Sequence, residues 1–281
     1  MLDPSDPLQA FSLVGRVAVV TGAAGLLGQQ HCRALAHAGA TVVATDLEPD
    51  ACASVARAVS AAGKGRVHGV AADITSRASV EALRDATLRL GDRLDVIVNN
   101  AALNDRFADP DPERVEVASR FENTDLERFR QTLEVNVTGT FLVSQVLGTE
   151  MARRRGGSII NVASTYGMVG PDQRIYRRPD GTQAFWKSAA YPASKGAVLA
   201  FTRFLATTWA ERGVRVNSLS PGGVAQAGQE DYFIEQYAAR TPLGRLAGAH
   251  ELGGAIVFLA SDASSYMTGA NLVVDGGWTA W

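Results

Sequence analysis

The sequence contains little that would support a disulfide-bonded, metal-binding or nucleic-acid-binding protein. Only two cysteines, Cys32 and Cys52, occur among 281 residues, and both fall in predicted helices, which argues against a disulfide framework and a zinc site. The four histidines, at positions 31, 37, 68 and 250, lack the spacing of metal ligands, so we expect no metal. The formal net charge of −2 provides no basic surface for nucleic acid or an anionic membrane.

Long hydrophobic runs are also absent. No apolar run approaches the roughly 18 residues that are needed to span a bilayer. The first residues, MLDPSDPLQAF, carry acid and proline where a signal peptide needs a basic start and an apolar stretch. We therefore expect a soluble, cytoplasmic protein. The one excess is glycine, with 28 residues in the chain.

Short β-branched runs alternate with longer helical patterns along the whole chain. This alternation predicts βαβ units, and therefore a doubly wound parallel α/β sheet of about seven strands with helices on both faces. Because no linker divides the chain, we expect one domain over residues 1–281. The predicted strands cover residues 17–21, 41–45, 67–71, 94–98, 158–162, 214–219 and 271–274. The predicted helices lie near residues 26–38, 51–62, 76–90, 126–154, 191–212 and 250–261.

Two segments interrupt this alternation. Residues 103–125 are polar, contain Pro110 and Pro112, and are interpreted as a loop or a short irregular helix. Residues 167–190 form a long connection between a predicted strand and a predicted helix. Because connections longer than about 12–15 residues are uncommon and often functional, we expect an active-site insertion there.

Glycines follow the first predicted strand at positions 22, 25 and 28, where the next helix begins. Glycine permits a tight turn and lets the backbone approach a pyrophosphate, which then lies on the helix N-terminus. An ordinary strand-to-helix turn is the alternative. Asp46 ends the next strand, 18 residues after Gly28, where an acid bonds both ribose hydroxyls and repels a 2′-phosphate. NAD is therefore favoured over NADP, although Asp46 as a solvated turn residue remains an alternative.

Tyr191 and Lys195 are four residues apart on a predicted helix and so share a face. A tyrosine with its ordinary pKa near 10 is a poor base at pH 7, and lowering that pKa by about 3 units requires roughly 4 kcal/mol. A lysine charge about 5 Å away contributes some 3 kcal/mol at an effective dielectric constant of 20. Tyr191 is thus a candidate general base for an alcohol, and Ser164 is a candidate to hold the reacting oxygen. Taken singly, such residues also occur by chance, as a helix cap in the case of Ser164.

These residues belong to a series of motifs that resembles the single-domain branch of the short-chain dehydrogenase/reductase family over essentially residues 14–278. The motifs are TGAAGLLG at 21–28, Asp73-Ile74, NNAA at 99–102, Asn136 in EVNVTG, Ser164 ending IINVAS, YPASK at 191–195, SPGGV at 220–224 and VDGGW at 274–278. The resemblance implies a Rossmann-like fold and a homotetramer with helices 126–154 and 191–212 and the last strand at its interfaces.

The resemblance also implies the site residues. The catalytic set would be Asn136, Ser164, Tyr191 and Lys195, with Asn136 anchoring a water that links Lys195 to solvent. The cofactor-binding set would be Gly22, Gly25, Leu27, Gly28, Asp46, Leu47, Asp73, Ile74, Asn100, Ala101, Tyr191, Lys195, Pro221, Gly222 and Val224.

The sequence departs from the family pattern at two positions. Leu26 stands where the commoner TGxxxGxG spacing has glycine, and the observed TGxxGxxG is usual in sugar-nucleotide epimerases and dehydratases. Those enzymes build a C-terminal substrate domain, whereas here about 60 residues follow the SPGG strand, with one expected helix and the last strand. Gln226 occupies a place where a threonine often helps to hold the carboxamide.

The favoured function is an NAD-dependent oxidoreductase that transfers hydride between a secondary alcohol and the nicotinamide. The alternatives are a sugar-nucleotide epimerase or dehydratase and a non-catalytic NAD-binding regulator. The 167–190 segment carries a charge of +4 − 2 = +2 and aromatic residues, which favours a sugar, a sugar acid or a related polyol. We expect Arg174, Arg178 and Trp186 to contact that substrate. Alternatively, the arginines form a solvated surface or pair with a neighbouring subunit or with the acidic 103–125 segment.

Overall fold

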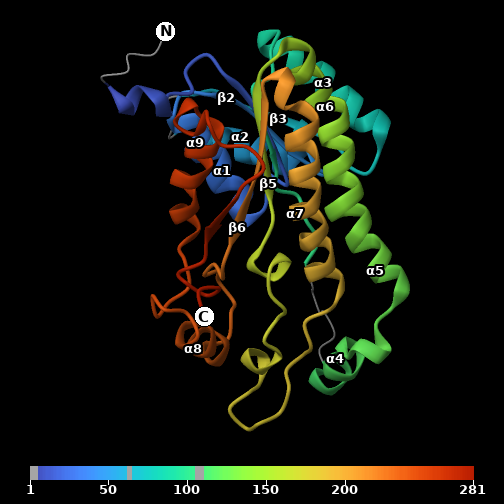
Figure 1. Ribbon diagram of the computed structural model, residues 1–281. Coiled ribbons are helices and arrows are strands. Elements are labelled where there is room, and N and C mark those ends of the chain that lie inside the picture. Colours follow the sequence, from blue (N-terminus) through green and yellow to red (C-terminus); the bar gives the residue numbers. More distant parts are fainter. Residues whose placement is uncertain (1–5, 62–64, 105–110) are drawn as a thin grey trace.

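The computed structural model describes residues 6–61, 65–104 and 111–281, and these residues contain one seven-stranded parallel sheet with helices on both sides (Figure 1). The strand order is β3-β2-β1-β4-β5-β6-β7, and every pairing is parallel. This arrangement confirms the predicted fold class. The strands are β1 (Val17–Thr21), β2 (Thr41–Asp46), β3 (Val67–Ala71), β4 (Val96–Asn99), β5 (Gly157–Val162), β6 (Val214–Pro221) and β7 (Asn271–Val274).

Helices cover both faces of the sheet because each connection between parallel strands must cross over one face. One buried cluster lies between the sheet and α1, α2 and α9, and another lies between the sheet and α3, α6 and α7. The central strands β1 and β4 are buried throughout, as expected of strands covered on both sides. The helices are α1 (Leu26–His37), α2 (Pro49–Ser60), α3 (Arg77–Gly91), α4 (Pro112–Ser119), α5 (Leu126–Leu133), α6 (Thr140–Arg154), α7 (Ala190–Trp209), α8 (Asp231–Ala239) and α9 (Gly253–Ala260).

The strand order reverses at β1, which pairs with β2 on one side and β4 on the other. In open α/β sheets, ligands bind outside the carboxyl ends of the strands at such a point. The segments that follow Thr21, Asp46 and Asn99 therefore emerge at the same edge of the sheet. This edge is where the sequence predicts its site.

Two features of the helices differ from the prediction. The expected helix 126–154 is interrupted by a π-helical turn, η3 (Glu134–Gly139), whose wider turn the local composition does not reveal. The expectation of one helix after the SPGG strand is wrong, because α8 precedes α9. Helix α8 has only nine residues and is stabilised by tertiary packing of Tyr237, which sequence periodicity does not predict.

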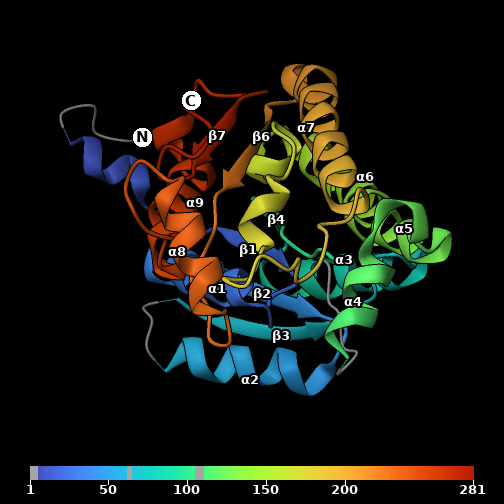
Figure 2. The ribbon, with the colours of Figure 1, turned by 90° about the horizontal axis from the view of Figure 1, so that it is seen from below.

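The 167–190 segment, α8 and the short helix α4 gather beyond the carboxyl ends of the strands (Figure 1). Figure 2 looks onto this end and shows the segment between α8 and α4. Arg240, the residue that caps the end of α8, donates to Asp172 at 2.8 Å, and Gln236 of α8 donates to the carbonyl oxygen of Arg177 at 2.6 Å. The short helix expected within 103–125 is α4, and residues 105–110 lie outside the described part of the chain. In the described residues, no helix has the length and apolar character needed to cross a membrane.

Candidate active site

A cavity of about 710 Å³ lies over the carboxyl ends of the strands. Asp46 and Asp73 lie on its wall after β2 and β3, whereas Ser164, Tyr191 and Lys195 come from β5 and α7. Fourteen of the fifteen residues predicted to bind the cofactor line this one cavity: Gly22, Gly25, Leu27, Asp46, Leu47, Asp73, Ile74, Asn100, Ala101, Tyr191, Lys195, Pro221, Gly222 and Val224. The remaining one, Gly28, packs behind the glycine turn.

The glycine turn after β1 is too tight for side chains. Gly22 has a φ of +63°, and a Cβ atom there would lie 2.7 Å from the Cα atom of Ala101. A Cβ atom on Gly28 would lie 2.1 Å from the carbonyl oxygen of Gly22, so α1 approaches the turn closely only because glycine stands there. Helix α1 begins after Gly25, which makes no side-chain capping bond. Its first N–H groups are thus suited to a pyrophosphate.

Asn100 holds this turn against β4. Its side-chain Nδ2 donates to the carbonyl oxygens of Thr21 and Gly22, each at 3.0 Å. The hydroxyl of Thr21 accepts hydrogen bonds from the backbone N–H groups of Asn100 and Ala101, each at 3.1 Å. Asn100 is therefore a positioning residue that fixes the shape of the cofactor cradle.

Asp46 lies at the end of β2 with its carboxylate fixed in place. One oxygen accepts a hydrogen bond from the backbone N–H of Ala24 and the other from the N–H of Leu47, both at 2.9 Å. Acceptance from Ala24 ties the carboxylate to the glycine turn itself. A negative charge is thereby held on the cavity wall beside the turn, where a ribose would lie.

Ser164, Tyr191 and Lys195 meet at the other end of the cavity. The Lys195 ammonium lies 5.6 Å from the centre of the Tyr191 ring. Lys195 is only 3% exposed and donates to the carbonyl oxygen of Val162 at 2.7 Å. Burial lowers the pKa of Lys195 to about 8, so the group still carries its charge at pH 7. Ser164 is buried at the end of β5, and its Oγ accepts from the N–H of Tyr166 at 3.2 Å.

Asn136 lies in the π-helical turn and is nearly fully buried. Its side chain accepts from the N–H of Leu103 at 2.7 Å and donates to the carbonyl oxygen of Leu103 at 3.0 Å. It also donates to the Ser194 hydroxyl at 2.9 Å, next to Lys195. Asn136 does not line the cavity, and it joins the loop after β4 to α7. Its contacts suit a positioning residue.

Sequence reasoning missed several residues that line the cavity beside Tyr191: Tyr166, Tyr176, Lys187, Phe233 and Tyr237. The hydroxyls of Tyr166 and Tyr176 lie 3.2 Å apart, and the Tyr237 hydroxyl accepts from the N–H of Gly223 at 2.6 Å. Burial raises the pKa of Tyr166 and of Tyr237, which keeps both phenols neutral. The position of 167–190 between Ser164 and Tyr191 pointed to Tyr176 and Lys187, whereas nothing in the sequence pointed to α8.

The structure does not bring Arg174, Arg178 and Trp186 to the cavity. Arg174 is exposed and bonds to Asp172 of its own segment, at 2.9 Å. Arg178 donates to Thr182 and to the carbonyl oxygen of Gln183. The Trp186 indole N–H donates to Glu116 of α4 at 2.7 Å. Thus Glu116 of the acidic 103–125 segment binds Trp186, whereas Arg174 and Arg178 bond to residues of their own 167–190 segment.

The chain matches known proteins along nearly its whole length. The short chain dehydrogenase family model matches residues 16–176, and the Enoyl-(Acyl carrier protein) reductase model matches residues 180–279. The chain is 36% identical over 276 residues to a D-threitol dehydrogenase of Mycolicibacterium smegmatis, covering 96% of this chain and 95% of the relative. It is 39% identical over 268 residues to a cis-4-hydroxycyclohexanecarboxylate dehydrogenase of Sinomonas cyclohexanicum, covering 94% and 97%.

A solved structure agrees with this match. The structure of a gluconate 5-dehydrogenase from Burkholderia cenocepacia, in complex with NADP and tartrate, superposes with a TM-score of 0.82. The two chains are 29% identical, and the match covers 98% of this chain and all of the other. The chain therefore belongs to the short-chain dehydrogenase/reductase family and is a nicotinamide-dependent oxidoreductase that acts on CH–OH groups.

Proposed function

We propose that this enzyme is an NAD-dependent dehydrogenase of a secondary alcohol that is a sugar, a sugar acid or a related polyol. The observation that carries the proposal is the convergence of Ser164, Tyr191 and Lys195 in the same cavity as Asp46. The relatives named for D-threitol and for a hydroxycyclohexanecarboxylate support this substrate class. The glycine turn fits a dinucleotide, because the neighbouring backbone leaves no room for a side chain at Gly22 or Gly28, and the bare turn can approach a pyrophosphate.

In the proposed reaction, bound NAD supplies the hydride acceptor. The Tyr191 phenolate takes the proton of the substrate alcohol in the oxidative direction, and the resulting hydroxyl returns it in the reductive direction. The Ser164 hydroxyl holds the reacting oxygen and stabilises the charge that develops there. The Lys195 ammonium, near the Tyr191 ring, stabilises the phenolate and so makes the proton easier to remove. Lys195 would also bond the nicotinamide ribose of the bound cofactor, and Asn136 positions α7 through Ser194.

The substrate assignment is tested by following NADH formation with a panel of polyols, sugar acids and cyclic alcohols. We expect steady NADH production with at least one of them. Tyr191→Phe should reduce kcat by about 10²- to 10⁴-fold, because it removes only the oxygen that exchanges the proton. Binding of NADH, measured by its fluorescence, should stay close to that of the wild type.

Each rival function gives a different result in this panel. An epimerase or dehydratase recycles its cofactor and accumulates no NADH, whereas a regulator turns over nothing. Retained turnover in Tyr191→Phe would assign the base to another group. The rival epimerase is disfavoured because the chain after β6 forms α8, α9 and β7, of which β7 is the edge strand of the sheet and α9 packs on the sheet, whereas the extended enzymes build a substrate domain there.

The choice of NAD follows from the charges on the cavity wall. Among the described residues that line the cavity, the two cations, Lys187 and Lys195, lie beside Tyr191, and none lies beside Asp46. A 2′-phosphate would therefore face the carboxylate of Asp46 without a compensating cation. We expect kcat/KM for NAD to exceed that for NADP by about 100-fold or more, because like charges in contact cost several kcal/mol.

Asp46→Asn should reduce that preference, whereas Asp50→Asn, on the exposed first turn of α2, should leave it unchanged. The measurement is kcat/KM for both cofactors with one alcohol. Equal efficiencies in the wild type would remove Asp46 from its proposed role.

We also propose that residues 1–281 act as one domain in a cytoplasmic homotetramer. Phe141 of α6, Phe204 of α7 and Val273 of β7 support these interfaces, because they are large apolar side chains exposed on the elements expected there. Light scattering of the purified enzyme measures the stoichiometry, and a monomer would contradict the proposal.

A further inference from the structure

The phenol of Tyr237 connects α8 to the loop that leaves β6. The Tyr237 side chain is only 4% exposed, and its oxygen accepts a hydrogen bond from the backbone N–H of Gly223 at 2.6 Å. Tyr237 and Gly223 both line the cavity that contains Tyr191. Tyr237 therefore reaches from a helix outside the sheet to the backbone of a loop that forms the cavity wall.

The ring of Tyr237 is held by other aromatic rings. It stacks on Trp278, in the turn after β7, with ring centres 4.1 Å apart and an angle of 17° between the ring planes. The ring of Phe233, one turn earlier on α8, lies 5.8 Å from it. All three rings belong to one apolar cluster at this end of the molecule. This packing fixes where the phenol oxygen lies, which is what a specific bond to a backbone N–H requires.

The loop at Gly223 is also held from its other sides. The carbonyl oxygen of Gly223 accepts from the N–H of Ala247 at 2.9 Å, and the N–H of Gly222 donates to the carbonyl oxygen of Val274 at 3.0 Å. A Cβ atom on Gly223 would lie 2.5 Å from Cζ of Tyr237, so the phenol packs directly on the bare backbone. Tyr237 thus provides the contact from α8 in a loop that β7 and residue 247 hold as well.

This loop lies at the reacting end of the cavity. Strand β6 pairs with β5, so the loop after β6 emerges beside Ser164, which follows β5. Residues 221–224 line the cavity together with Ser164 and Tyr191. In the proposed reaction the hydride leaves the carbon whose oxygen Ser164 and Tyr191 hold, so a nicotinamide must lie at this end. The glycine turn and Asp46 hold the opposite end of the dinucleotide.

We propose that Tyr237 is a positioning residue for the nicotinamide, because its phenol oxygen fixes the Gly223 N–H and with it the 221–224 loop. This inference rests on the proposed function and gives α8 a part in the geometry of the cofactor site. Hydride transfer depends steeply on distance and orientation, so a small displacement of this loop slows the chemical step. Binding of the adenosine half depends on the glycine turn and Asp46, and is independent of Tyr237.

The test compares binding of NADH with binding of ADP-ribose, which lacks the nicotinamide, by calorimetry. The wild type should bind NADH about tenfold or more tightly than ADP-ribose. Tyr237→Phe keeps the ring and removes the acceptor of the Gly223 N–H. It should reduce the ratio of the two affinities by about fivefold or more and leave the affinity for ADP-ribose within about twofold of the wild type. With an oxidised alcohol, its kcat should fall by about tenfold or more.

Tyr232→Phe is the matched control, because it removes a phenol of the same helix that is half-buried and does not line the cavity. It should keep the wild-type ratio and kcat. Tyr237→Leu removes the ring as well, so urea unfolding should show a much larger loss of stability in Tyr237→Leu than in Tyr237→Phe, whereas most of the loss in kcat should already appear in Tyr237→Phe.

Gly223→Ala tests the same contact from the loop. Its methyl group would meet the Tyr237 phenol, so it should also reduce the ratio of NADH to ADP-ribose affinity and spare the affinity for ADP-ribose. This second variant leaves α8 and its aromatic packing unchanged in sequence, and so it decides the question if Tyr237→Phe does not fold.

Four outcomes would overturn the inference: a wild type that binds NADH no better than ADP-ribose, a wild-type ratio and kcat in Tyr237→Phe, equal losses for both ligands, or a kinetic loss that appears only in Tyr237→Leu. The last two would assign Tyr237 to packing alone. Because calorimetry needs no turnover, a nicotinamide-specific loss in Tyr237→Phe without NADH production from any alcohol would refute the proposed function and leave this inference standing.

Discussion

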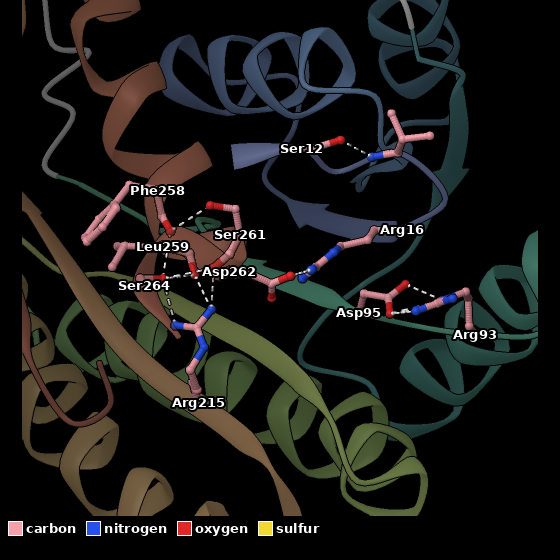
Figure 3. A network of polar contacts seen from close by, with 11 residues as sticks. Ser12, Arg16, Arg93, Asp95, Arg215, Phe258, Leu259, Ser261, Asp262 and Ser264 are labelled. Atoms are coloured by element: carbon pink, nitrogen blue, oxygen red, sulfur yellow. Dashed lines mark hydrogen bonds and ion pairs between the residues drawn. The ribbon is translucent and has the colours of Figure 1, made fainter. Parts of the chain in front are cut away.

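The two ends of the sheet each contain a concave surface and a cation at least half-buried, and they differ in how the hydrogen-bond donors of that cation are satisfied. The concavity at the amino ends of the strands is the larger, about 1150 Å³ compared with about 710 Å³ for the cavity that contains Tyr191. At the amino end, Arg215 of β6 lies among the turns that follow α9 (Figure 3). At the carboxyl end, Lys195 is buried beside Tyr191, with its ammonium 5.6 Å from the centre of the Tyr191 ring.

Arg215 makes four hydrogen bonds to the described residues from its five N–H donors. Its guanidinium donates to the carbonyl oxygens of Leu259, Ser261 and Met267 and to the hydroxyl of Ser264, at 2.8 to 3.3 Å. Burial lowers the pKa of Arg215, although a guanidinium keeps its charge at any physiological pH. Of the other arginines of this concavity, three form ion pairs, namely Arg16 with Asp262, Arg93 with Asp95 and Arg154 with Asp92. The fourth, Arg155, donates to the carbonyl oxygen of Glu211. This end of the molecule is a structural network.

Lys195 is more deeply buried and yet makes one hydrogen bond to the described residues, to the carbonyl oxygen of Val162. An ammonium has three donors, so the fold leaves Lys195 under-satisfied, as expected of a group that serves a ligand and a neighbouring phenol. The comparison teaches that the size of a cavity does not identify the site. The incompletely satisfied buried charge does.

The largest effect should come from Lys195→Met. Removing a charge about 5 Å from Tyr191 takes away about 3 kcal/mol of phenolate stabilisation, so kcat at pH 7 should fall by about 100-fold or more. The same variant should be more stable than the wild type at pH 7, by about 2 kcal/mol. That gain is the cost of burying the charge, about 3 kcal/mol from the lowered pKa, less about 1 kcal/mol for the lost hydrogen bond.

The stability gain expected of Lys195→Met depends on pH. The pKa of Lys195 is lowered from 10.5 to about 8 in the folded protein, so the wild type gains stability as pH rises through that window and the advantage of Lys195→Met shrinks. Urea unfolding at pH 7 and pH 10 measures it. A variant less stable than the wild type at pH 7 would show that Lys195 is structural, like Arg215.

Arg215→Met should lose stability and keep activity, which is the opposite of what we expect for Lys195→Met. The variant leaves buried acceptors of Leu259, Ser261 and Ser264 without their donor, and we expect a loss of about 3 kcal/mol or more in the free energy of unfolding. The kcat of the folded enzyme should stay within about twofold of the wild type, because Arg215 lies at the far end of the sheet. A loss of kcat comparable to that of Lys195→Met would contradict the division between the two ends.

The sequence was sufficient for the sheet and for the placement of Tyr191 beside Lys195. Each buried strand is a β-branched run, and Tyr191 and Lys195 lie four residues apart on a helix, so their shared face follows from helical geometry alone. The glycines were equally informative, because the turn at Gly22 admits no side chain. At these positions the structure follows from short-range geometry, namely the spacing of residues on a helix and the steric limit of a tight turn.

The substrate end of the cavity could not be predicted in the same way. The net charge of 167–190 indicated that a cation of this segment faces the site, but an irregular segment has no periodicity from which to choose one. The choice is made by side-chain contacts within the segment: Asp172 binds Arg174, which is exposed, and Gln173 fixes the backbone of Lys187. Helix α8 was missed for a related reason, since its position depends on the packing of Tyr237 against Trp278, with ring centres 4.1 Å apart.

A third buried group, His31, makes no side-chain hydrogen bond to the described residues. It lies fully buried in α1, and neither ring nitrogen has a hydrogen-bond partner among the described residues. Burial lowers the pKa of His31 from 6.5 to about 4. The unfolded chain therefore binds a proton at His31 at a higher pH than the folded protein does. The contribution of neutral His31 to the free energy of unfolding is complete above pH 6.5 and is lost as the pH falls toward 4.

Between pH 7 and pH 5 this one group should remove about 2 kcal/mol from the free energy of unfolding. His31→Leu, which fills the space without a titratable ring, should remove that contribution. His37→Leu is the control, because His37 lies on the same helix and is exposed, with Nδ1 2.8 Å from the carbonyl oxygen of Arg33. Urea unfolding of the three proteins at pH 5 and pH 7 measures the effect. Carboxylates contribute equally to all three proteins, so the difference in pH dependence between the wild type and His31→Leu isolates the effect of His31. An identical pH dependence in these two proteins would show that the His31 ring does not destabilise the folded protein in acid.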